Sequence, residues 1–379
     1  MSAPTIGSLV SLLEGLYPPA RAEDWDRVGL VIGARSAEVR RVLYTVDVTW
    51  AVVEQARRRD AQLIIAHHPL LLRGIHAVDL DHPKGRLVAQ LITSGIGLYV
   101  AHTNADVPTG GTVDALAHTL GLQDCRPLVP APAERLDKII TFVPNDHAQQ
   151  LTDALAVAGA GAVGDYDRCA FLTEGTGTFR PLEGSDPYLG RTGQVERVSE
   201  TRIEMVLDRS RRDAVVSALL AAHPYETPAY DVLELAAVAG DAGLGRVGTL
   251  PVPRSLRDFA ATVAAALPPT AVGARVSGVA DQEISVVAVQ AGAGDDLLDV
   301  ARSSGADVYV TSDLRHHPAS EAREWSPAPA LIDIPHWAAE WTWLPVVRTL
   351  VDDGLAATGH RVESVISEIC TDPWDFVIR

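Results

Sequence analysis

The chain has 379 residues, of which 47% are hydrophobic and 21% are charged, and its formal net charge is −17 at pH 7. This length exceeds the size at which a single core stops growing, so we expect two or three domains, and the composition excludes a disordered chain. The negative charge argues against binding to nucleic acid or to an anionic membrane, because phosphates attract basic surfaces.

The termini and the cysteines indicate a protein of the cytoplasm. No basic segment leads into an apolar run at the N-terminus, and no apolar stretch approaches the roughly 20 residues that span a bilayer. Cys125, Cys169 and Cys370 are odd in number, far apart and outside any Cys-x-x-Cys pattern, which is typical of ordinary reduced thiols. Any metal bound here must therefore rely on histidines and carboxylates.

The first third of the chain predicts alternating helices and strands. Apolar spacing indicates a helix over residues 6–17, and apolar runs predict strands at 42–46, 63–66 and 97–101, with a second helix over 51–59. This alternation is typical of a parallel α/β sheet. Such sheets bind ligands beyond the carboxyl ends of their strands.

Two polar clusters follow the second and third of these strands. His67 and His68 project in different directions, so one place in the chain can serve two ions, although the pair alone is better explained as hydrogen-bonding residues that close the loop before Pro69. Asp106 adds a carboxylate, but Asp is also common in turns and at helix N-caps. His102 is either a ligand or a residue that orients one.

The middle of the chain indicates a different kind of domain. Pro127, Pro130 and Pro132 mark a linker, and the elements predicted after it follow the order strand, helix, strand, strand, helix, strand. This is the ferredoxin-like arrangement. The glycine-rich stretch 175–193 is predicted as a long loop. We therefore expect an inserted α+β domain over residues 132–240.

The last third of the chain repeats the pattern of the first. Predicted strands at 285–289 and 306–311 flank a helix over 295–303, and the second strand leads into His316 and His317 followed by proline. The repetition predicts an internal duplication with one site between two similar lobes, although chance similarity of two βαβ units is the alternative.

The predicted architecture is thus α/β, with two similar lobes that form a core and an α+β insert between them in sequence. We place the first lobe at residues 1–131 and the second at residues 241–379.

A third cluster follows a further predicted strand at 331–334. His336 and Glu340 are four residues apart on a predicted helix, so they lie on one face and can converge on one ion, although surface pairs at this spacing are common. Together the clusters offer nitrogen and oxygen ligands that suit two divalent ions of Zn, Fe, Mn or Co, with waters completing the shells. The candidate ligands are His67, His68, Asp106, His336 and Glu340.

Seven motifs occur in order along nearly the whole chain: WDRVGL at 25–30, AHHP at 66–69, AHTNAD at 101–106, GTGTFRP at 175–181, AHPYETP at 222–228, SDLRHH at 312–317 and DIPHWAAE at 333–340. As an ordered set they resemble the Nif-three-like family, whose members are also called GTP cyclohydrolase I type 2 homologues or dinuclear metal centre hexameric proteins. The resemblance implies a two-lobed α/β protein that assembles as a homohexamer, with two metal ions between the lobes and an insert similar to PII and CutA proteins.

The resemblance also implies roles for single residues. It assigns His68 and Asp106 to one ion. It assigns His67 and His336 to the other ion, with Glu340 bridging the two.

Around this site the resemblance places His316 and His317 in the cavity, where they orient ligands or act as acid and base. The chain departs from the family pattern at Ser312 and Pro335, where glycine is usual. Because proline fixes φ and lacks an N–H, Pro335 puts the direction of the helix that carries His336 in doubt.

Three functions fit these residues. The first is a metal-dependent hydrolase of a small phosphate-bearing or nucleotide-like substrate, because open bridged metal pairs activate water and Arg315 lies near the extra histidines. Ring-opening of GTP fits these residues only loosely, since no motif indicates recognition of a guanine base. The chain also lacks a Walker loop or dinucleotide fingerprint. The second is a metal-handling or sensing protein, and the third is a scaffold that metals stabilise.

Overall fold

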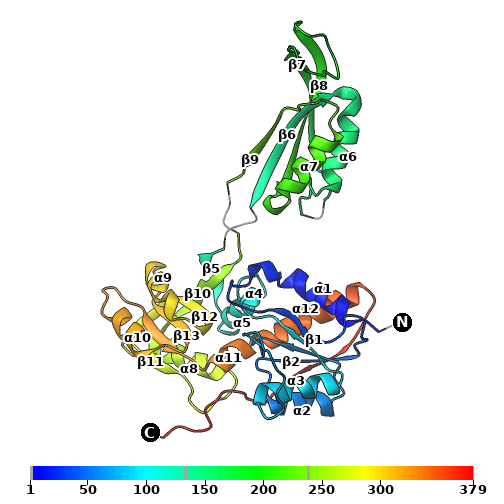
Figure 1. The fold of residues 1–379 in the computed structure, drawn as a ribbon. Helices are drawn as coiled ribbons and strands as arrows, with labels where there is room; N and C mark the ends of the chain where they lie inside the picture. The colour runs from blue at the N-terminus through cyan, green and yellow to red at the C-terminus, as the bar shows by residue number, and fades with distance from the viewer. Residues whose placement is uncertain (1–2, 132–134, 165, 237–239, 379) are drawn as a thin grey trace. The chain divides into compact units, whose positions relative to one another are not determined.

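The computed structural model describes residues 3–131, 135–164, 166–236 and 240–378. The chain divides into two compact units, one made of Met1–Ala131 with Gly240–Arg379 and the other of Pro132–Ala239 (Figure 1). Within the described residues, no helix is long and apolar enough to cross a membrane.

The first sheet of the larger unit has five strands in the order β1-β4-β3-β2-β15. The strands are β1 (Gly29–Ile32), β2 (Arg41–Thr45), β3 (Leu63–Ala66), β4 (Gly97–Val100) and β15 (Glu363–Ile366). All are parallel except β1, which pairs antiparallel with β4. The helices of this lobe are α1 (Ile6–Leu16), α2 (Trp50–Arg58), α3 (Pro83–Thr93), the short α4 (Thr103–Asp106) and α12 (Trp343–Ala357).

The second sheet has six strands in the order β11-β14-β13-β12-β10-β5. The strands are β5 (Gln123–Pro130), β10 (Gly243–Ser255), β11 (Arg275–Ser277), β12 (Glu283–Ala293), β13 (Val308–Ser312) and β14 (Ala330–Asp333). Only β12, β13 and β14 are mutually parallel. The helices of this lobe are α5 (Thr112–Thr119), α8 (Leu256–Ala266), α9 (Leu298–Ser303), α10 (His316–Arg323) and α11 (His336–Trp341).

The two lobes exchange elements, so they do not follow the predicted ranges 1–131 and 241–379. Strand β5 precedes the insert but joins the second sheet, because it pairs antiparallel with β10 and brings Pro130 opposite Gly243. Strand β15, near the C-terminus, returns to the first sheet beside β2. The predicted parallel strands and their helices are otherwise present, with the predicted helix over 295–303 formed by a 3₁₀ turn (Asp295–Leu297) and α9.

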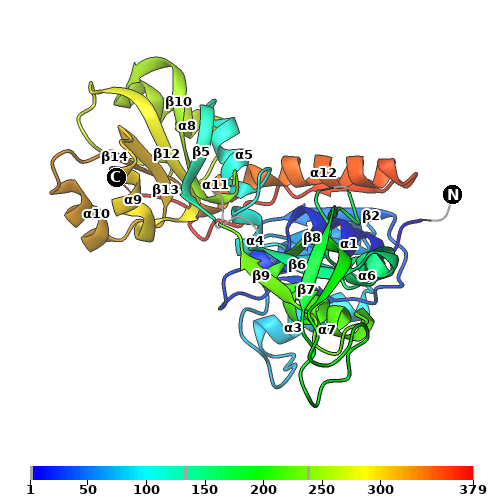
Figure 2. The same ribbon diagram turned by 90° about the horizontal axis from the view of Figure 1, so that it is seen from above.

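One hydrophobic cluster runs through both lobes and fixes them to each other. It contains residues of the first sheet such as Tyr44 and Ile65 together with residues of the second sheet such as Val289 and Ile332. Helix α12, which lies alongside α1 (Figure 2), contributes the fully buried Trp343. This packing places the carboxyl ends of strands from both sheets next to α11.

The smaller unit is a four-stranded antiparallel sheet with two helices, in the predicted order βαββαβ. The elements are β6 (Leu136–Pro144), α6 (Ala148–Val157), β7 (Phe171–Phe179), β8 (Glu196–Asp208), α7 (Arg212–Ala222) and β9 (Tyr230–Glu234), and the strand order is β7-β8-β6-β9. The first part of the expected loop 175–193 is instead strand, because β7 pairs with β8 as far as Phe179.

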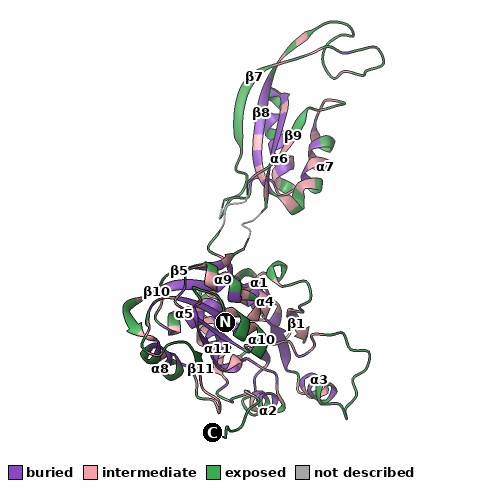
Figure 3. Cartoon of the chain, turned by 90° about the vertical axis from the view of Figure 1, so that its left-hand side faces the viewer, coloured by how far each residue is buried: buried purple, intermediate pink, exposed green. Residues whose placement is uncertain are grey.

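The two faces of this sheet differ in burial. Side chains such as Val143, Ile203 and Met205 form a core with α6 and α7 on one face. On the other face burial is mixed, because Ile140 and Glu200 are buried and Arg202 is exposed. Strand β7 is exposed along nearly its whole length (Figure 3). The helices of the smaller unit therefore cover one face of its sheet and leave the other without a helix.

Candidate metal centre

The structure brings together the five residues that the sequence nominates as metal ligands. His67 and His68 follow β3, Asp106 ends α4 after β4, and His336 and Glu340 lie on α11 after β14. Each follows the carboxyl end of a parallel strand, as expected for an α/β site. His102, which the sequence leaves as a ligand or an orienting residue, lies in the same group.

The backbone holds the two adjacent histidines in fixed directions. Strand β3 is buried throughout, and its pairing with β2 continues beyond its end, with the amide of His67 donating to Thr45 at 3.1 Å and that of His68 to Val46 at 2.9 Å. The two residues form a bend after β3, and their imidazole rings lie with centroids 5.1 Å apart and planes at 38°.

Glu340 lies at the middle of the cluster and is 3% exposed. Its Oε1 lies 3.3 Å from His67 Nε2 and 2.9 Å from His336 Nε2, and its Oε2 lies 2.9 Å from His68 Nε2. His67 Nε2 is also 3.9 Å from Asp106 Oδ1. A single carboxylate therefore faces three imidazoles from two lobes.

The four histidines share one orientation. In each, Nδ1 donates outward to an oxygen: His67 to the Ala101 carbonyl at 2.8 Å, His68 to Asp47 at 2.7 Å, His102 to Asp26 at 2.9 Å and His336 to Asp313 at 2.6 Å. An imidazole with Nδ1–H so engaged carries its lone pair on Nε2, which is the arrangement found in metal-binding histidines.

The inward atoms of the cluster lack hydrogen bonds. Nε2 of His67, Nε2 of His336 and Oε2 of Glu340 are buried and make no hydrogen bond to any residue that the structure describes. Buried polar atoms are normally satisfied, so such a group of three calls for a partner. Nitrogen and carboxylate donors that converge in this way fit divalent metal ions.

The close charges alter proton binding strongly. Burial opposes a charged imidazole, but the negative charge of Glu340 and the hydrogen bonds to Asp47 and Asp313 outweigh it, raising the pKa of His68 to about 10 and that of His336 to about 11. Burial raises the pKa of Asp106, whereas the surrounding histidines hold the pKa of Glu340 well below its usual range. In the metal-free protein, protons therefore take the place that cations would hold.

The side chains form two overlapping groups that could each hold an ion. One group is His67, His68 and His102, and the other is His68, His336 and Glu340, so His68 belongs to both. The division that the resemblance implies, with His68 and Asp106 on one ion and His67 and His336 on the other, stays a prediction.

Sequence reasoning missed the carboxylates that orient the histidines. Asp47, Asp26 and Asp313 come from separate segments, and Thr112 donates a short hydrogen bond to Asp106. Asp313 adopts a left-handed backbone with φ 55°, a conformation that Asp tolerates better than most residues. The motifs around residues 25–30 and 312–317 contained two of these acids, but nothing in their spacing assigned them a role.

His316 and His317 do not reach this cluster. Both are exposed at the start of α10, and within the described part of the chain neither makes a hydrogen bond or ion pair to a candidate ligand. His316 lines a separate hollow beside Arg275 and Arg323. Within one chain, the structure therefore does not bring this pair to the candidate ligands.

Pro335 leaves the geometry of α11 intact. It occupies the N-cap with φ −59°, and its carbonyl accepts the amide of Ala339 at 3.0 Å. The amide of an N-cap residue lies outside the helical hydrogen bonds, so proline removes no donor that the helix needs. Ser312 is fully buried at the end of β13.

A hollow of about 490 Å³ leads to the second group of ligands. His68 and His336 line it, together with Arg275, which donates to Asp333, and Trp374 from the C-terminal segment. Asp47, Asp313, Asp333 and Asp372 line the same hollow, so carboxylates outnumber the single arginine, whose charge is paired with Asp333.

The fold and the site together define a mixed α/β protein with a buried cluster of histidines and carboxylates suited to metal ions. The model of the Duf34/NIF3 (NGG1p interacting factor 3) family matches residues 4–373, and the chain belongs to this family.

Named relatives and solved structures support this family assignment. The chain is 44% identical to a Mycobacterium leprae protein named GTP cyclohydrolase 1 type 2 homolog, over 99% of this chain and 96% of that protein. A Bacillus subtilis protein of the same name is 40% identical over 83% and 84%. Among solved structures, a Bacillus cereus protein related to NIF3 is 39% identical with a TM-score of 0.79, and Staphylococcus aureus SA1388 is 30% identical with a TM-score of 0.83, each with full coverage of both chains.

Proposed function

We propose that the cluster is a dinuclear centre for divalent ions and that the protein is a metal-dependent hydrolase of a small phosphate-bearing or nucleotide-like molecule. The observation that carries the metal site is the common orientation of the four histidines, with Nδ1 held outward and Nε2 turned toward the buried Glu340.

In this proposal His68 and Asp106 would hold one ion and His67 and His336 the other, as the resemblance implies. Glu340 would bridge them, because its Oε1 faces His67 and His336 and its Oε2 faces His68. His102, which groups with His67 and His68, is a further candidate ligand. So few side chains would leave positions open for water and substrate, and open positions distinguish catalytic from structural metal sites.

Zn, Fe, Mn or Co ions in such a centre supply Lewis acidity and lower the pKa of water when bound. The chain itself supplies the rest. Asp47 and Asp313 fix the imidazoles of His68 and His336. Arg275 lines the same hollow but is paired with Asp333, so it would bind a phosphate only by exchanging that partner. The name of the relatives, GTP cyclohydrolase 1 type 2 homolog, supports a nucleotide-like substrate.

A second candidate function is metal handling or sensing without turnover. One observation favours it: His316 and His317, which the hydrolase hypothesis used as acid and base, lie outside the hollow. The smaller unit, which we infer to be a PII- or CutA-like module, also suits a regulatory protein.

One experiment separates these functions. Metal-loaded protein is incubated with a broad panel of phosphate-bearing metabolites and nucleotides, beside a Glu340→Ala variant. Turnover by the native protein that the variant loses supports the hydrolase. Stoichiometric metal binding without turnover of any panel member favours metal handling.

We further infer a homohexamer in the cytoplasm, on the resemblance and on the three cysteines, which are unpaired and exposed. Analytical ultracentrifugation of the full chain tests the assembly. A monomer at micromolar concentration would contradict it.

A further inference from the structure

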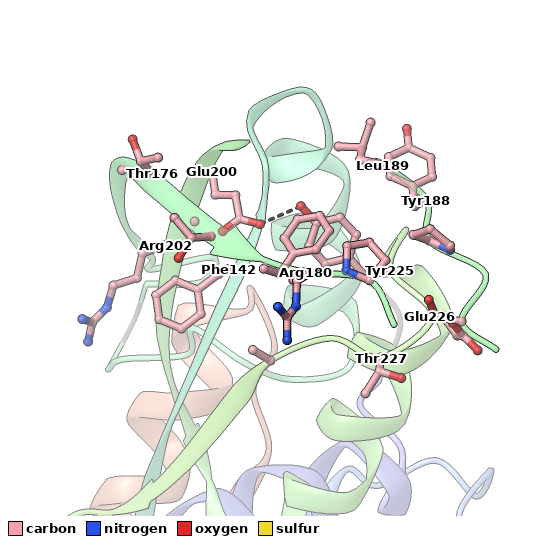
Figure 4. Close-up of a pocket in the computed structure, with 18 of the residues that line it drawn as sticks. Phe142, Thr176, Arg180, Tyr188, Leu189, Glu200, Arg202, Tyr225, Glu226 and Thr227 are labelled. Atoms are coloured by element: carbon pink, nitrogen blue, oxygen red, sulfur yellow. Dashed lines mark hydrogen bonds between the residues drawn. The ribbon is translucent and has the colours of Figure 1, made fainter. Parts of the chain in front are cut away.

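The smaller unit carries a cavity of about 760 Å³ on the uncovered face of its sheet (Figure 4). Phe142, Glu200 and Arg202 line it. Phe142 and Arg202 neighbour the core residues Val143 and Ile203, and Glu200 lies two residues from Arg202 on β8, so these three side chains project from the opposite face. The loop 180–189 and the segment 225–229 form the remaining walls. This volume is typical of sites for small organic ligands.

Two glycines of β7 make room for the cavity. Gly175 lies opposite Glu200 in the sheet, and a Cβ added to it would meet no atom within 4 Å. A Cβ added to Gly177 would come within 1.8 Å of Glu200 Oε2. The missing side chains therefore open the cavity at Gly175 and let the carboxylate of Glu200 lie against the strand at Gly177.

Glu200 supplies the cavity with a buried carboxylate. The residue is 8% exposed, and its Oε1 accepts a hydrogen bond of 2.6 Å from the hydroxyl of Tyr225. Among the described residues, none donates a hydrogen bond to Oε2. A carboxylate oxygen that lines the cavity and has no protein donor can accept a hydrogen bond from a ligand with N–H groups.

Aromatic rings line the same cavity. Phe179 and Tyr225 lie with their ring centroids 5.8 Å apart, and Tyr188 and Tyr225 with theirs 6.3 Å apart. His147 fixes the hydroxyl of Tyr188 at 2.9 Å. Together with Phe142 they present flat apolar surfaces, which bind the faces of heteroaromatic bases.

The cavity also holds a free positive charge. Arg202 pairs with Glu204 at 3.0 Å, but Arg180 is exposed and forms no ion pair within the described part of the chain. The lining thus combines a donor-seeking carboxylate, aromatic faces and a guanidinium that suits a phosphate.

We propose that this cavity binds a guanine nucleotide, with the base among the aromatic rings, its N–H edge on Glu200 and its phosphate on Arg180. Guanine presents two adjacent donor groups, N1–H and the N2 amine, to a carboxylate that can only accept. Adenine places the acceptor N1 beside its amine, so the same carboxylate repels it. A free amino acid would leave most of the cavity empty.

Isothermal titration of the full-length protein tests the proposal. GTP, GMP, ATP and AMP are titrated in buffer with a chelator, so that no metal ion bridges a nucleotide to the metal centre. We expect one guanine nucleotide per chain, bound at least about tenfold more tightly than its adenine counterpart, because a hydrogen bond to a charged group contributes about 1.5–3 kcal/mol.

Two variants test the site. Glu200→Gln keeps the volume and an acceptor for Tyr225 but loses the charge, so guanine affinity should fall about 10- to 100-fold. Gly175→Leu places a side chain in the open space and should abolish binding while metal content stays unchanged. The matched control is Asp213→Asn, which removes an exposed carboxylate on α7 outside the cavity lining and should bind like the native protein.

Three results would overturn the proposal. They are absence of guanine-nucleotide binding at millimolar concentration, equal affinity for adenine and guanine nucleotides, and unchanged affinity in folded Glu200→Gln or Gly175→Leu protein. Far-ultraviolet circular dichroism of each variant establishes that it is folded.

Discussion

The metal centre of the larger unit and the cavity of the smaller unit are built in opposite ways. In the first, side chains that follow strands of two sheets converge, and Glu340 is buried among histidines. In the second, Gly175 and Gly177 have no side chains, and the space beside them is lined by the carboxylate of Glu200 and by aromatic rings. The metal centre should therefore be disrupted by substitutions that shorten a side chain, and the cavity by substitutions that lengthen one.

The largest effect should follow removal of the central carboxylate. Glu340→Ala should lower metal content from about two ions per chain to near zero, because Glu340 faces both groups of histidines. Elemental analysis after reconstitution measures this, with the exposed Glu321→Ala on α10 as control. Retention of two ions by Glu340→Ala would show that the bridge is wrongly assigned.

A smaller loss should follow removal of an orienting acid. Asp47→Asn keeps the shape but weakens the hold on Nδ1 of His68, so affinity for one of the two ions should fall about 10- to 100-fold. Competition with a chromogenic chelator measures it. The exposed Asp353→Asn on α12 is the control, and equal affinities in both variants would contradict the role of Asp47.

Proton release should accompany metal binding. With pKa values of about 10 and about 11, His68 and His336 are protonated in the metal-free protein at pH 7, and metal binding must displace those protons. Affinity should therefore rise with pH through neutrality and fall on acidification. Calorimetry in buffers of different ionisation enthalpy should show release of about two protons per chain. Zero release would mean that the two histidines are neutral before metal binds.

Alanine substitutions at the two glycines of β7 should have different effects on the stability of the smaller unit. Gly177→Ala drives a methyl into Glu200 and should destabilise the smaller unit by about 1–3 kcal/mol. Gly175→Ala meets open space at a φ that alanine tolerates, and should be neutral or stabilising by up to about 1 kcal/mol. Denaturant unfolding compares them, and equal destabilisation would contradict the described cavity.

Removal of the insert should have the smallest effect on the metal centre. Because β5 and β10 are paired with Pro130 opposite Gly243, a short linker can replace residues 132–239 without disturbing the second sheet. Metal content should stay at about two ions per chain. A soluble, folded deletion protein that has lost its metals would contradict the independence of the two sites.

The strands predicted correctly from sequence are those with strong local signals, such as the continuous apolar run of β3. The candidate ligands His67 and Asp106 follow the carboxyl ends of such strands, where parallel sheets gather their polar residues, and their role as ligands stays a prediction. The outward partners Asp47 and Asp313 carry no local signal, because their role exists only once distant segments meet. The extension of β7 was hidden by glycines, which are poor strand formers unless a partner strand supplies the hydrogen bonds.

The return of β15 to the first sheet sets an order of events during synthesis. Glu363–Ile366 pairs with Arg41–Thr45, so the first sheet lacks its edge strand, and one side of β2 stays open, until nearly the whole chain has left the ribosome. The smaller unit is drawn from one continuous stretch and can form its contacts earlier. One edge of β2 thus remains unpaired until β15 has been synthesised. A chain that stops before residue 363 leaves that edge exposed to pairing with other chains.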